Sequence, residues 1–387
     1  MTLMNPLLIQ IVARLTPSLC GVSDYAILLA QELERCYGIG SAFVVLNSGE
    51  RCGLSYPIAY SSSSQLLEAC TSLAMDRQTA ILLQCSGYGF SRDGAPLFLA
   101  EALRRVRKSG QFRIGAYFHE LYASGMVWRS VFWHSHRQKE AVRRIAAESD
   151  LIATNLGRHY DWLMREVNQR PSAPIQWLPV SSNVGECQKI PPISGRRSAM
   201  VVFGLPATRR TAYDQLSSLG KMLNGLGIEE ILDAGPAFDV PPRVSGIPVK
   251  RMGVLPAADI TTELRGLKFG YVPHPPHALA KSGVFAGLCA HGAIAVLGRS
   301  FAGEVDELID GVHLVSPRTA NAAIAGGLDN CSRAAWHWYA QHRLHVHAEI
   351  YARWLFPSLI DGGAGTLEAG TAAEKSVIAE SGSGREG

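Results

Sequence analysis

A loop with a central glycine precedes the first expected helix of the chain. In segment 17–25, Gly21 and Val22 lie between an apolar run at 7–13 and an amphipathic stretch at 25–36. A glycine here lets backbone N–H groups approach a phosphate or a sugar, and the helix N-terminus adds partial positive charge. The loop has no G-x-G-x-x-G spacing, which argues against a dinucleotide site. Gly21 and Val22 are therefore candidate substrate-binding residues, with a plain tight turn as the alternative.

A second loop joins a lysine to the start of a later helix. Lys281, Ser282 and Gly283 follow an apolar run at 269–272 and a loop rich in proline and histidine. A lysine, a serine hydroxyl and the first amides of a helix together make a cradle for a phosphate. The spacing of a P-loop is absent. These three residues are candidate phosphate-binding residues, and an ordinary capped helix with an exposed lysine is the alternative.

Two polar side chains follow the apolar run at 113–118, namely His119 and Glu120. In open α/β sheets ligands bind outside the carboxyl ends of the strands, so both side chains are expected in a site. His119 can donate a hydrogen bond to a sugar hydroxyl or a phosphate, and Glu120 can orient it or act on an acceptor. They are the candidate catalytic residues, and a structural histidine is the alternative.

Two arginines, Arg209 and Arg210, come just after another apolar run at 200–203. Arginines at the carboxyl end of a strand can pair with a diphosphate in forked geometry. Both are candidate substrate-binding residues, and a surface loop is the alternative.

No set of residues predicts a metal site, a cofactor or a nucleophilic enzyme. Histidines recur at 134–136, 274–277 and 342–347, but no cysteine or carboxylate spacing completes a zinc set. No G-x-S-x-G elbow and no matched cysteine and histidine pattern is present. We therefore expect neither a metal nor a bound cofactor.

The composition is that of a folded chain with about two domains. Of 387 residues, 47% are hydrophobic and 18% are charged. The net charge of +4 is far from that of a dedicated nucleic-acid binder, so we expect no nucleic-acid partner. Basic runs at 104–108 and 137–144 predict solvated helix faces, with peripheral contact to an anionic membrane as the alternative. Scattered cysteines and the lack of a membrane-spanning run favour a cytoplasmic protein.

Short apolar runs alternate with amphipathic stretches, which is typical of βα units and predicts parallel sheets. Ser23 or Asp24 is the expected N-cap of the first helix. Strands are expected at 7–13, 42–46, 80–85, 113–118, 151–154, 200–203, 231–234, 269–272 and 293–297, and helices at 25–36, 96–108, 138–148, 158–166, 212–223, 258–264, 282–290 and 334–355.

A polar connector that contains several prolines divides this series into two halves. We expect an N-terminal Rossmann-like domain at 1–180, a linker at 181–197, a C-terminal Rossmann-like domain at 198–335, a closing helix at 336–360 and a flexible tail at 361–387. The predicted fold class is α/β, with two doubly wound domains.

Three segments resemble motifs of the family 4 class of retaining glycosyltransferases, which have the GT-B fold. Segments 288–296 and 303–315 resemble the E-A-M-A-x-G-x-P-V-V and P-E-L-I-x-D-G-x-x-G-x-L-V motifs. Segment 21–26, with the Leu-Leu-Ala that follows, is similar to the G-G-V-x-x-Y … L-A opening of the class. His119 falls where the class has a histidine near the donor sugar.

The resemblance implies two Rossmann-like domains facing each other across a cleft, the acceptor mainly on the N-terminal one and a nucleotide-diphosphate sugar mainly on the other. By resemblance, Gly21 approaches the donor phosphates, while Lys281 and either Arg209 or Arg210 neutralise the diphosphate. Glu307 is then expected near the nucleotide or the sugar.

The chain is a divergent case, because the paired glutamates of the class are replaced by Leu279 and Gly287. The double glycine of the opening loop is here Cys20 and Gly21.

The function implied by the resemblance is hexosyl transfer, with retention, from a nucleotide-diphosphate sugar to a hydroxyl of a saccharide or lipid-linked acceptor, in cell-surface polysaccharide synthesis. Three alternatives stay open. One is a sugar-nucleotide epimerase or hydrolase on the same architecture. The second is a phosphorylase-like enzyme in which Lys281 anchors an aldehyde cofactor. The third is a non-catalytic protein that binds a nucleotide-sugar.

Overall fold

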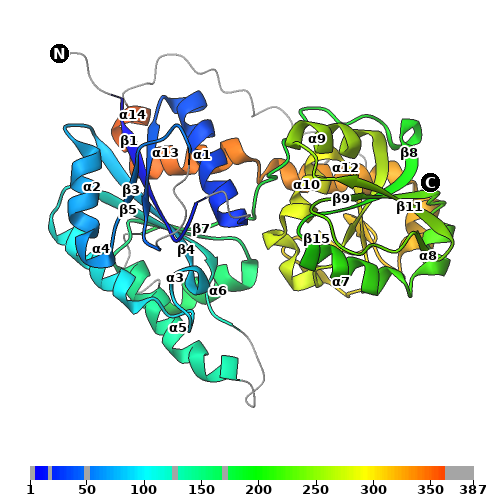
Figure 1. Ribbon diagram of the computed structural model, residues 1–387, viewed down its shortest axis with the longest axis horizontal. Coiled ribbons are helices and arrows are strands. Elements are labelled where there is room, and N and C mark those ends of the chain that lie inside the picture. Colours follow the sequence, from blue (N-terminus) through cyan, green and yellow to red (C-terminus); the bar gives the residue numbers. More distant parts are fainter. Residues whose placement is uncertain (1–4, 16–19, 48–52, 124–129, 168–172, 362–387) are drawn as a thin grey trace, which may run out of the picture.

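The computed structural model describes residues 5–15, 20–47, 53–123, 130–167 and 173–361, and the expected tail lies almost entirely outside this part of the chain. The described residues form two seven-stranded sheets, one after the other along the chain (Figure 1). A small two-stranded sheet accompanies the second. The predicted α/β class with two doubly wound, largely parallel sheets is confirmed.

The N-terminal sheet has the strand order β3-β2-β1-β4-β5-β6-β7, with every neighbouring pair parallel. Its order reverses between β1 and β4, which is where open α/β sheets bind ligands. The elements of this half are β1 (Leu7–Val12), α1 (Gly21–Tyr37), β2 (Gly40–Val45), β3 (Ile58–Tyr60), α2 (Leu66–Ala74), β4 (Thr79–Ser86), α3 (Gly87–Phe90), α4 (Leu97–Lys108), β5 (Arg113–Glu120), α5 (Ser130–Ala147), β6 (Leu151–Thr154), α6 (Gly157–Glu166) and β7 (Ile175–Trp177).

The C-terminal sheet has the order β10-β11-β9-β8-β12-β13-β16, with only β10 antiparallel to its neighbour. The elements of this half are β8 (Arg197–Phe203), α7 (Pro206–Leu216), α8 (Gly220–Gly225), β9 (Glu230–Ala234), β10 (Arg243–Val244), β11 (Ile247–Gly253), α9 (Ala257–Gly266), β12 (Leu267–Val272), the 3-10 helix η3 (Pro276–Lys281), α10 (Gly283–His291), β13 (Ile294–Leu297), β14 (Glu304–Val305), β15 (Leu308–Ile309), β16 (Leu314–Val315), α11 (Ala320–Gly326) and α12 (Leu328–Ala340).

Both sheets bury apolar side chains on both faces, as parallel sheets do. In β1, Leu7 and Ile9 belong to one core cluster, and Leu8 between them belongs to another. In β8, Val201 and Val202 face different clusters in the same way. Continuous apolar runs, rather than alternating ones, therefore mark the central strands.

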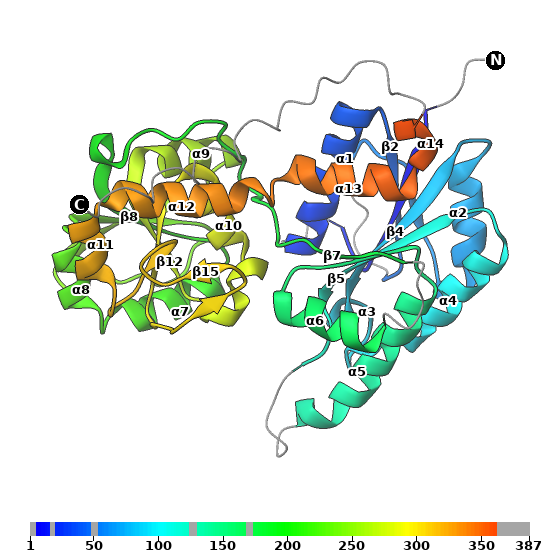
Figure 2. The ribbon, with the colours of Figure 1, turned by 180° about the vertical axis from the view of Figure 1, so that it is seen from behind.

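The last helices return to the first half of the chain. The sequence predicts one helix at 334–355, whereas the structure has α12 and then α13 (Leu344–Leu355), followed by α14 (Pro357–Asp361). Figures 1 and 2 both show α12 beside the C-terminal sheet and α13 beside α1 of the N-terminal half. The break is needed because the two helices pack on different cores, Tyr339 on one and Tyr351 on the other.

Other expectations differ in their bounds. The first helix begins at Gly21, four residues before the expected start, and its N-cap is Cys20 rather than Ser23 or Asp24. The helix expected at 212–223 is divided into α7 and α8. The domain boundaries stay a prediction. No helix in the described part of the chain has the length and apolar character needed to cross a membrane.

Candidate functional site

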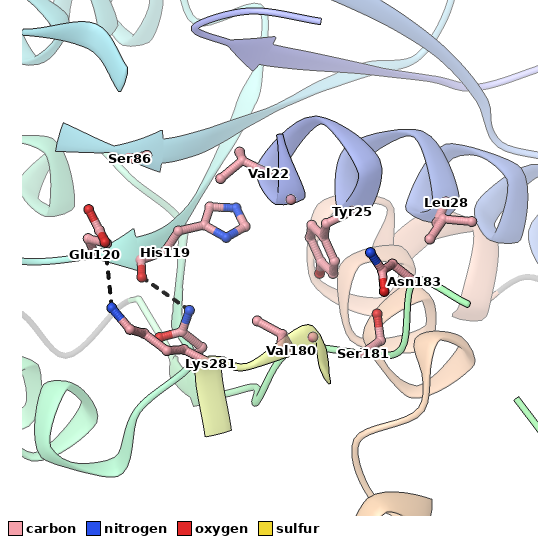
Figure 3. Close-up of a pocket in the computed structure, with 13 residues that line it drawn as sticks. Val22, Tyr25, Leu28, Ser86, His119, Glu120, Val180, Ser181, Asn183 and Lys281 are labelled. Carbon is pink, nitrogen blue, oxygen red and sulfur yellow. Dashed lines mark hydrogen bonds and ion pairs between the residues drawn. The ribbon is translucent and has the colours of Figure 1, made fainter. Parts of the chain in front are cut away.

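A cavity of about 250 Å³ lies between the carboxyl ends of strands of the N-terminal sheet and the start of α10 in the C-terminal half (Figure 3). We call it the main cavity. Its N-terminal wall follows β1, β4, β5 and β6, so it includes the reversal in strand order. The residues that line it are Gly21, Val22, Tyr25, Leu28, Ser86, His119, Glu120, Asn155, Val180, Ser181, Asn183, Lys281 and Gly283.

The N-terminus of α1 forms one wall of the main cavity. The N-cap, Cys20, has an extended backbone and makes no side-chain capping hydrogen bond. The amide of Asp24 is the first to donate within the helix, at 3.0 Å to the Cys20 carbonyl oxygen. The preceding amides, which include those of Gly21 and Val22, therefore have no acceptor inside the helix and carry the positive end of its dipole. The hydroxyl of Ser23 points away and donates to the Arg14 carbonyl oxygen.

The N-terminus of α10 forms the opposite wall. Its N-cap, Ser282, is buried, and the hydroxyl oxygen accepts a hydrogen bond from the Phe285 amide at 3.2 Å. The same oxygen is hydrogen-bonded to Nδ1 of His274. Ser282 thus caps the helix and does not line the cavity, contrary to its expected contact with a phosphate. The amide of Gly283 has no acceptor within the helix, and Gly283 does line the cavity.

Lys281 connects the two walls, because its ammonium nitrogen lies 3.5 Å from a carboxylate oxygen of Glu120. Glu120 ends β5 of the N-terminal sheet, while Lys281 follows β12 of the C-terminal sheet, and Figure 3 shows the two side chains meeting at the edge of the cavity. About a third of the Lys281 side chain is exposed. The ammonium is therefore accessible to a ligand that offers it a better anion than Glu120.

His119 lies on the floor of the main cavity at the end of β5 and is 7% exposed. Burial lowers the pKa of its imidazole to about 3, so the ring is neutral at physiological pH. Nε2 lies 2.9 Å from Oε1 of Gln84 on the neighbouring strand β4. A neutral, buried imidazole with one nitrogen already bonded is suited to hydrogen bonding and not to neutralising a phosphate.

A second cavity, also of about 250 Å³, adjoins the first, and Glu120 and Lys281 line both. We call it the side cavity. Its other residues are Gly87, Tyr88, Gly94, Leu121, Tyr122, Ala123, Gln138, Arg158 and His159. Aromatic rings and hydrogen-bonding groups therefore surround it, with one cation, Arg158, that forms no ion pair within the described residues.

Arg209 does not reach either cavity, and the expectation that it binds a diphosphate is corrected. Its side chain is 1% exposed, and Nε and Nη2 donate to the carboxylate of Asp233 at 3.1 and 2.7 Å. Nη1 donates to the Pro236 carbonyl oxygen. A buried cation must be paired, and these contacts use its forked donors. Arg210 lies near the Phe238 ring and lines neither cavity.

Glu307 also lies outside both cavities, contrary to expectation. It occupies the turn between β14 and β15 with a backbone φ of 61°, and its side chain is exposed. Its neighbour Asp306 instead reaches the N-terminal half, where a carboxylate oxygen accepts from the Gly157 amide at 2.9 Å. This contact places Asp306 at the N-terminus of α6 and ties the two halves together.

The positions of the missing paired glutamates lie in the interior. Leu279 is fully buried in the core of the C-terminal half. Gly287 is buried in α10, where an added Cβ would lie 3.1 Å from Val184 and 3.3 Å from Phe203. Neither position can present a glutamate to the main cavity without rearrangement, so other residues provide its polar groups.

Several further polar residues line the main cavity at positions that no sequence motif marks. Asn155 follows β6, just as His119 ends β5, so the same argument from strand ends applies to it. Ser181 and Asn183 belong to the segment interpreted as a linker, yet they form part of the wall. Burial raises the pKa of the neighbouring Asp24, and a hydrogen bond with Asn183 offsets part of this rise.

Comparison with known proteins supports the fold. No protein-family model and no curated sequence matches this chain. Among the solved structures that resemble it are the following three, with TM-scores of 0.55 to 0.57. An α-glucosyltransferase bound to UDP and a 13-mer DNA containing a HMU base is 11% identical, over 92% of this chain and 98% of its own, with a TM-score of 0.55. HepE from Anabaena, with UDP and glucose, is 10% identical over 90% of this chain and 99% of its own, with a TM-score of 0.55. The pneumococcal O-GlcNAc transferase GtfA, with UDP and GlcNAc, is 8% identical over 92% of this chain and 99% of its own, with a TM-score of 0.57.

These similarities establish that the chain has the GT-B fold, in which two Rossmann-like sheets face each other. They also correct one expectation. The exclusion of a nucleic-acid partner is wrong, because the α-glucosyltransferase with the same fold binds DNA in several structures. A small net charge is no basis for such an exclusion, since contacts to DNA phosphates depend on local positive groups.

Proposed function

We propose that this chain transfers a hexose from a nucleotide-diphosphate sugar, bound in the main cavity, to a hydroxyl of a saccharide or lipid-linked acceptor. One observation carries the proposal. The N-terminus of α1 from one half, and the N-terminus of α10 with Lys281 from the other half, converge on a single cavity.

This convergence supports a diphosphate as the ligand. Helix N-termini offer amide donors and partial positive charge, and Lys281 adds a full charge that can move from Glu120 to a phosphate. As the sugar leaves the diphosphate, negative charge develops on the leaving group, and these same groups stabilise it. No protein nucleophile is required for this step.

The side cavity supports the second half of the proposal, because it can hold an acceptor next to the donor. Tyr88 and Tyr122 offer aromatic surface for a sugar ring, and Gln138 and His159 offer hydrogen bonds. Glu120 lines both cavities, which places a carboxylate where it can accept the proton of an attacking hydroxyl.

The finer features of the reaction are proposals of the same kind. Glucose and GlcNAc accompany UDP in HepE and GtfA, which supports a hexose and UDP as the first pair to try. We propose retention of the anomeric configuration from the resemblance of segments 21–26 and 303–315 to retaining enzymes. The anomeric coupling constant of the product, measured by proton NMR, tests it. A role in cell-surface polysaccharide synthesis stays a prediction.

The first experiment is a calorimetric titration of the full chain with UDP, GDP, ADP, CDP and TDP. Binding of at least one is expected, and the absence of any binding would contradict the proposal. The matching nucleotide-sugars are then incubated with saccharides, lipid-linked sugars and duplex DNA, and transfer is followed by mass spectrometry. Release of sugar with water alone would indicate a hydrolase, and binding without turnover would indicate a non-catalytic protein.

A further inference from the structure

The short segment 155–159, which joins β6 to α6, contacts both halves of the chain. Figures 1 and 2 both show α6 on the side of the N-terminal half that faces the C-terminal half. Asn155 lines the main cavity, while Arg158 and His159 line the side cavity. Between them, Leu156 is fully buried and belongs to the core cluster of the C-terminal half, although β6 and α6 are elements of the N-terminal half. This segment therefore connects the walls of both cavities to the interface between the halves.

The carboxylate of Asp306 caps α6 from the opposite half. The N-cap of this helix, Leu156, has no side-chain oxygen, and Oδ1 of Asp306 accepts instead from the Gly157 amide at 2.9 Å. A carboxylate at a helix N-terminus satisfies an amide that the helix leaves free, and it interacts favourably with the helix dipole. The approach is close, because a Cβ at position 157 would lie 2.7 Å from the same oxygen. Glycine at this position therefore lets the carboxylate reach the backbone.

The turn that carries Asp306 is fixed by its own half, at a conformational cost. Asp306 and Glu307 join β14 to β15 with φ values of 52° and 61°. Two-residue hairpin turns with both φ values positive favour asparagine and glycine, so an Asp-Glu pair carries strain that the surrounding structure must support. Nε1 of Trp338 on α12 donates to the Asp306 carbonyl oxygen at 3.1 Å, and Leu308 is fully buried. The turn is thus anchored on both sides of the residue that reaches α6.

The ion pair between Lys281 and Glu120 crosses the same interface, but both side chains are partly exposed, and such pairs contribute little to stability. Another contact must fix the position of one half against the other. We infer that Asp306 is a positioning residue, which forms an interdomain clamp with Leu156 and Gly157. The clamp keeps the two halves in the arrangement in which Lys281 meets Glu120, before any ligand binds. It consists of the chain's own residues, so the inference goes beyond the proposed function and does not depend on the ligand.

The clamp can be broken from either side without replacing a residue that lines the main cavity or the side cavity. Asp306→Gly removes the carboxylate, and because glycine adopts a positive φ readily, the hairpin should stay folded. Gly157→Ala places a methyl group where the carboxylate lies. Asp306→Asn retains an oxygen that can accept from the Gly157 amide. The matched control is Glu307→Gly, which removes a carboxylate and a positive φ from the next residue of the turn, where the side chain is exposed.

The arrangement of the halves is measured on the full chain, without a ligand, by small-angle X-ray scattering and by hydrogen–deuterium exchange. In Asp306→Gly and in Gly157→Ala the radius of gyration should rise, and exchange in segment 155–159 should become about tenfold faster, the effect of losing one hydrogen bond to a charged group. The double variant should equal either single one, because both changes remove one contact. Asp306→Asn and Glu307→Gly should match the wild type. Exchange in β8 should not change, which distinguishes opening of the interface from a loss of global stability.

Wild-type scattering and exchange in both Asp306→Gly and Gly157→Ala would overturn the inference, and so would an equal rise in Glu307→Gly. If Asp306→Gly does not fold, Gly157→Ala decides alone, because its hairpin is unaltered. Failure of every nucleoside diphosphate to bind would contradict the proposed function and leave the clamp standing, since neither measurement needs a ligand.

Discussion

Replacing Lys281 by alanine should weaken the binding of the preferred nucleoside diphosphate by about 10-fold to 100-fold. Two unit charges 4 Å apart attract by about 4 kcal/mol at an effective dielectric constant of 20. Part of this attraction is offset, because the Lys281 side chain is one-third exposed and its ammonium must first leave the Glu120 carboxylate, 3.5 Å away. A remainder of about 1.4 to 2.8 kcal/mol is typical of a hydrogen bond to a charged group and gives the stated range.

The assay is calorimetric titration of wild type, Lys281→Ala and Lys221→Ala with the diphosphate that binds best. Lys221 is an exposed lysine of α8 that lines neither cavity, so its loss changes the net charge equally. The effect of Lys281 should shrink as salt is raised from about 0.1 M to about 1 M, over which the screening length falls from about 10 to 3 Å. A folded Lys281→Ala protein with unchanged affinity, or an equal loss in Lys221→Ala, would refute the reasoning.

Glu120→Gln should tighten diphosphate binding by about 3-fold to 10-fold, because Lys281 then has no ion pair to break before it binds the ligand. Turnover should fall by about 100-fold, because the carboxylate that accepts the proton is lost. Weaker diphosphate binding would contradict the expected effect on affinity. Arg209→Leu should lower the free energy of unfolding, measured in urea, by about 3 to 5 kcal/mol, because Asp233 is left as a buried carboxylate without its ion-pair partner. The affinity for the diphosphate should not change. A loss of diphosphate affinity with no loss of stability would show instead that Arg209 binds the ligand. Acidification should destabilise the wild type more than His119→Asn. The folded-state pKa of His119 is about 3, below its ordinary value of 6.5, so only the unfolded chain gains the proton as pH falls below 6.5. The difference should reach about 1.4 kcal/mol near pH 5.5, and parallel melting curves of the two proteins against pH would contradict it.

The central strands could be predicted from the sequence because they are buried on both faces and therefore read as continuous apolar runs. The strands at the edges of the sheets, or next to an edge, could not. β3 and β7 are edge strands of three residues and are only partly buried. β11 lies next to the edge strand β10 and exposes most of its side chains, so none of the three has a distinctive pattern. The break between α12 and α13 contains neither glycine nor proline, since it is imposed by packing on two separate cores.

The residues of the site that lie at the end of a strand or the start of a helix could be predicted from the sequence. Gly21, His119, Glu120 and Lys281 are such residues, and the structure brings them to one cavity. Arg209, in the first turn of α7, satisfies the same rule, but its partner Asp233 is 24 residues away on β9. Sequence alone does not distinguish a ligand-binding arginine from a buried structural one.

If the chain has the proposed function, the ion pair between Glu120 and Lys281 determines the order in which donor and acceptor bind. While the pair is intact, the carboxylate of Glu120 is occupied and cannot serve well as a base in the side cavity. A diphosphate in the main cavity draws Lys281 away, and the carboxylate is then free to accept a proton from an acceptor hydroxyl. Since both events use one ion pair, donor binding should precede productive acceptor binding. The contact between Asp306 and Gly157 does not involve either residue and can hold the two halves together throughout.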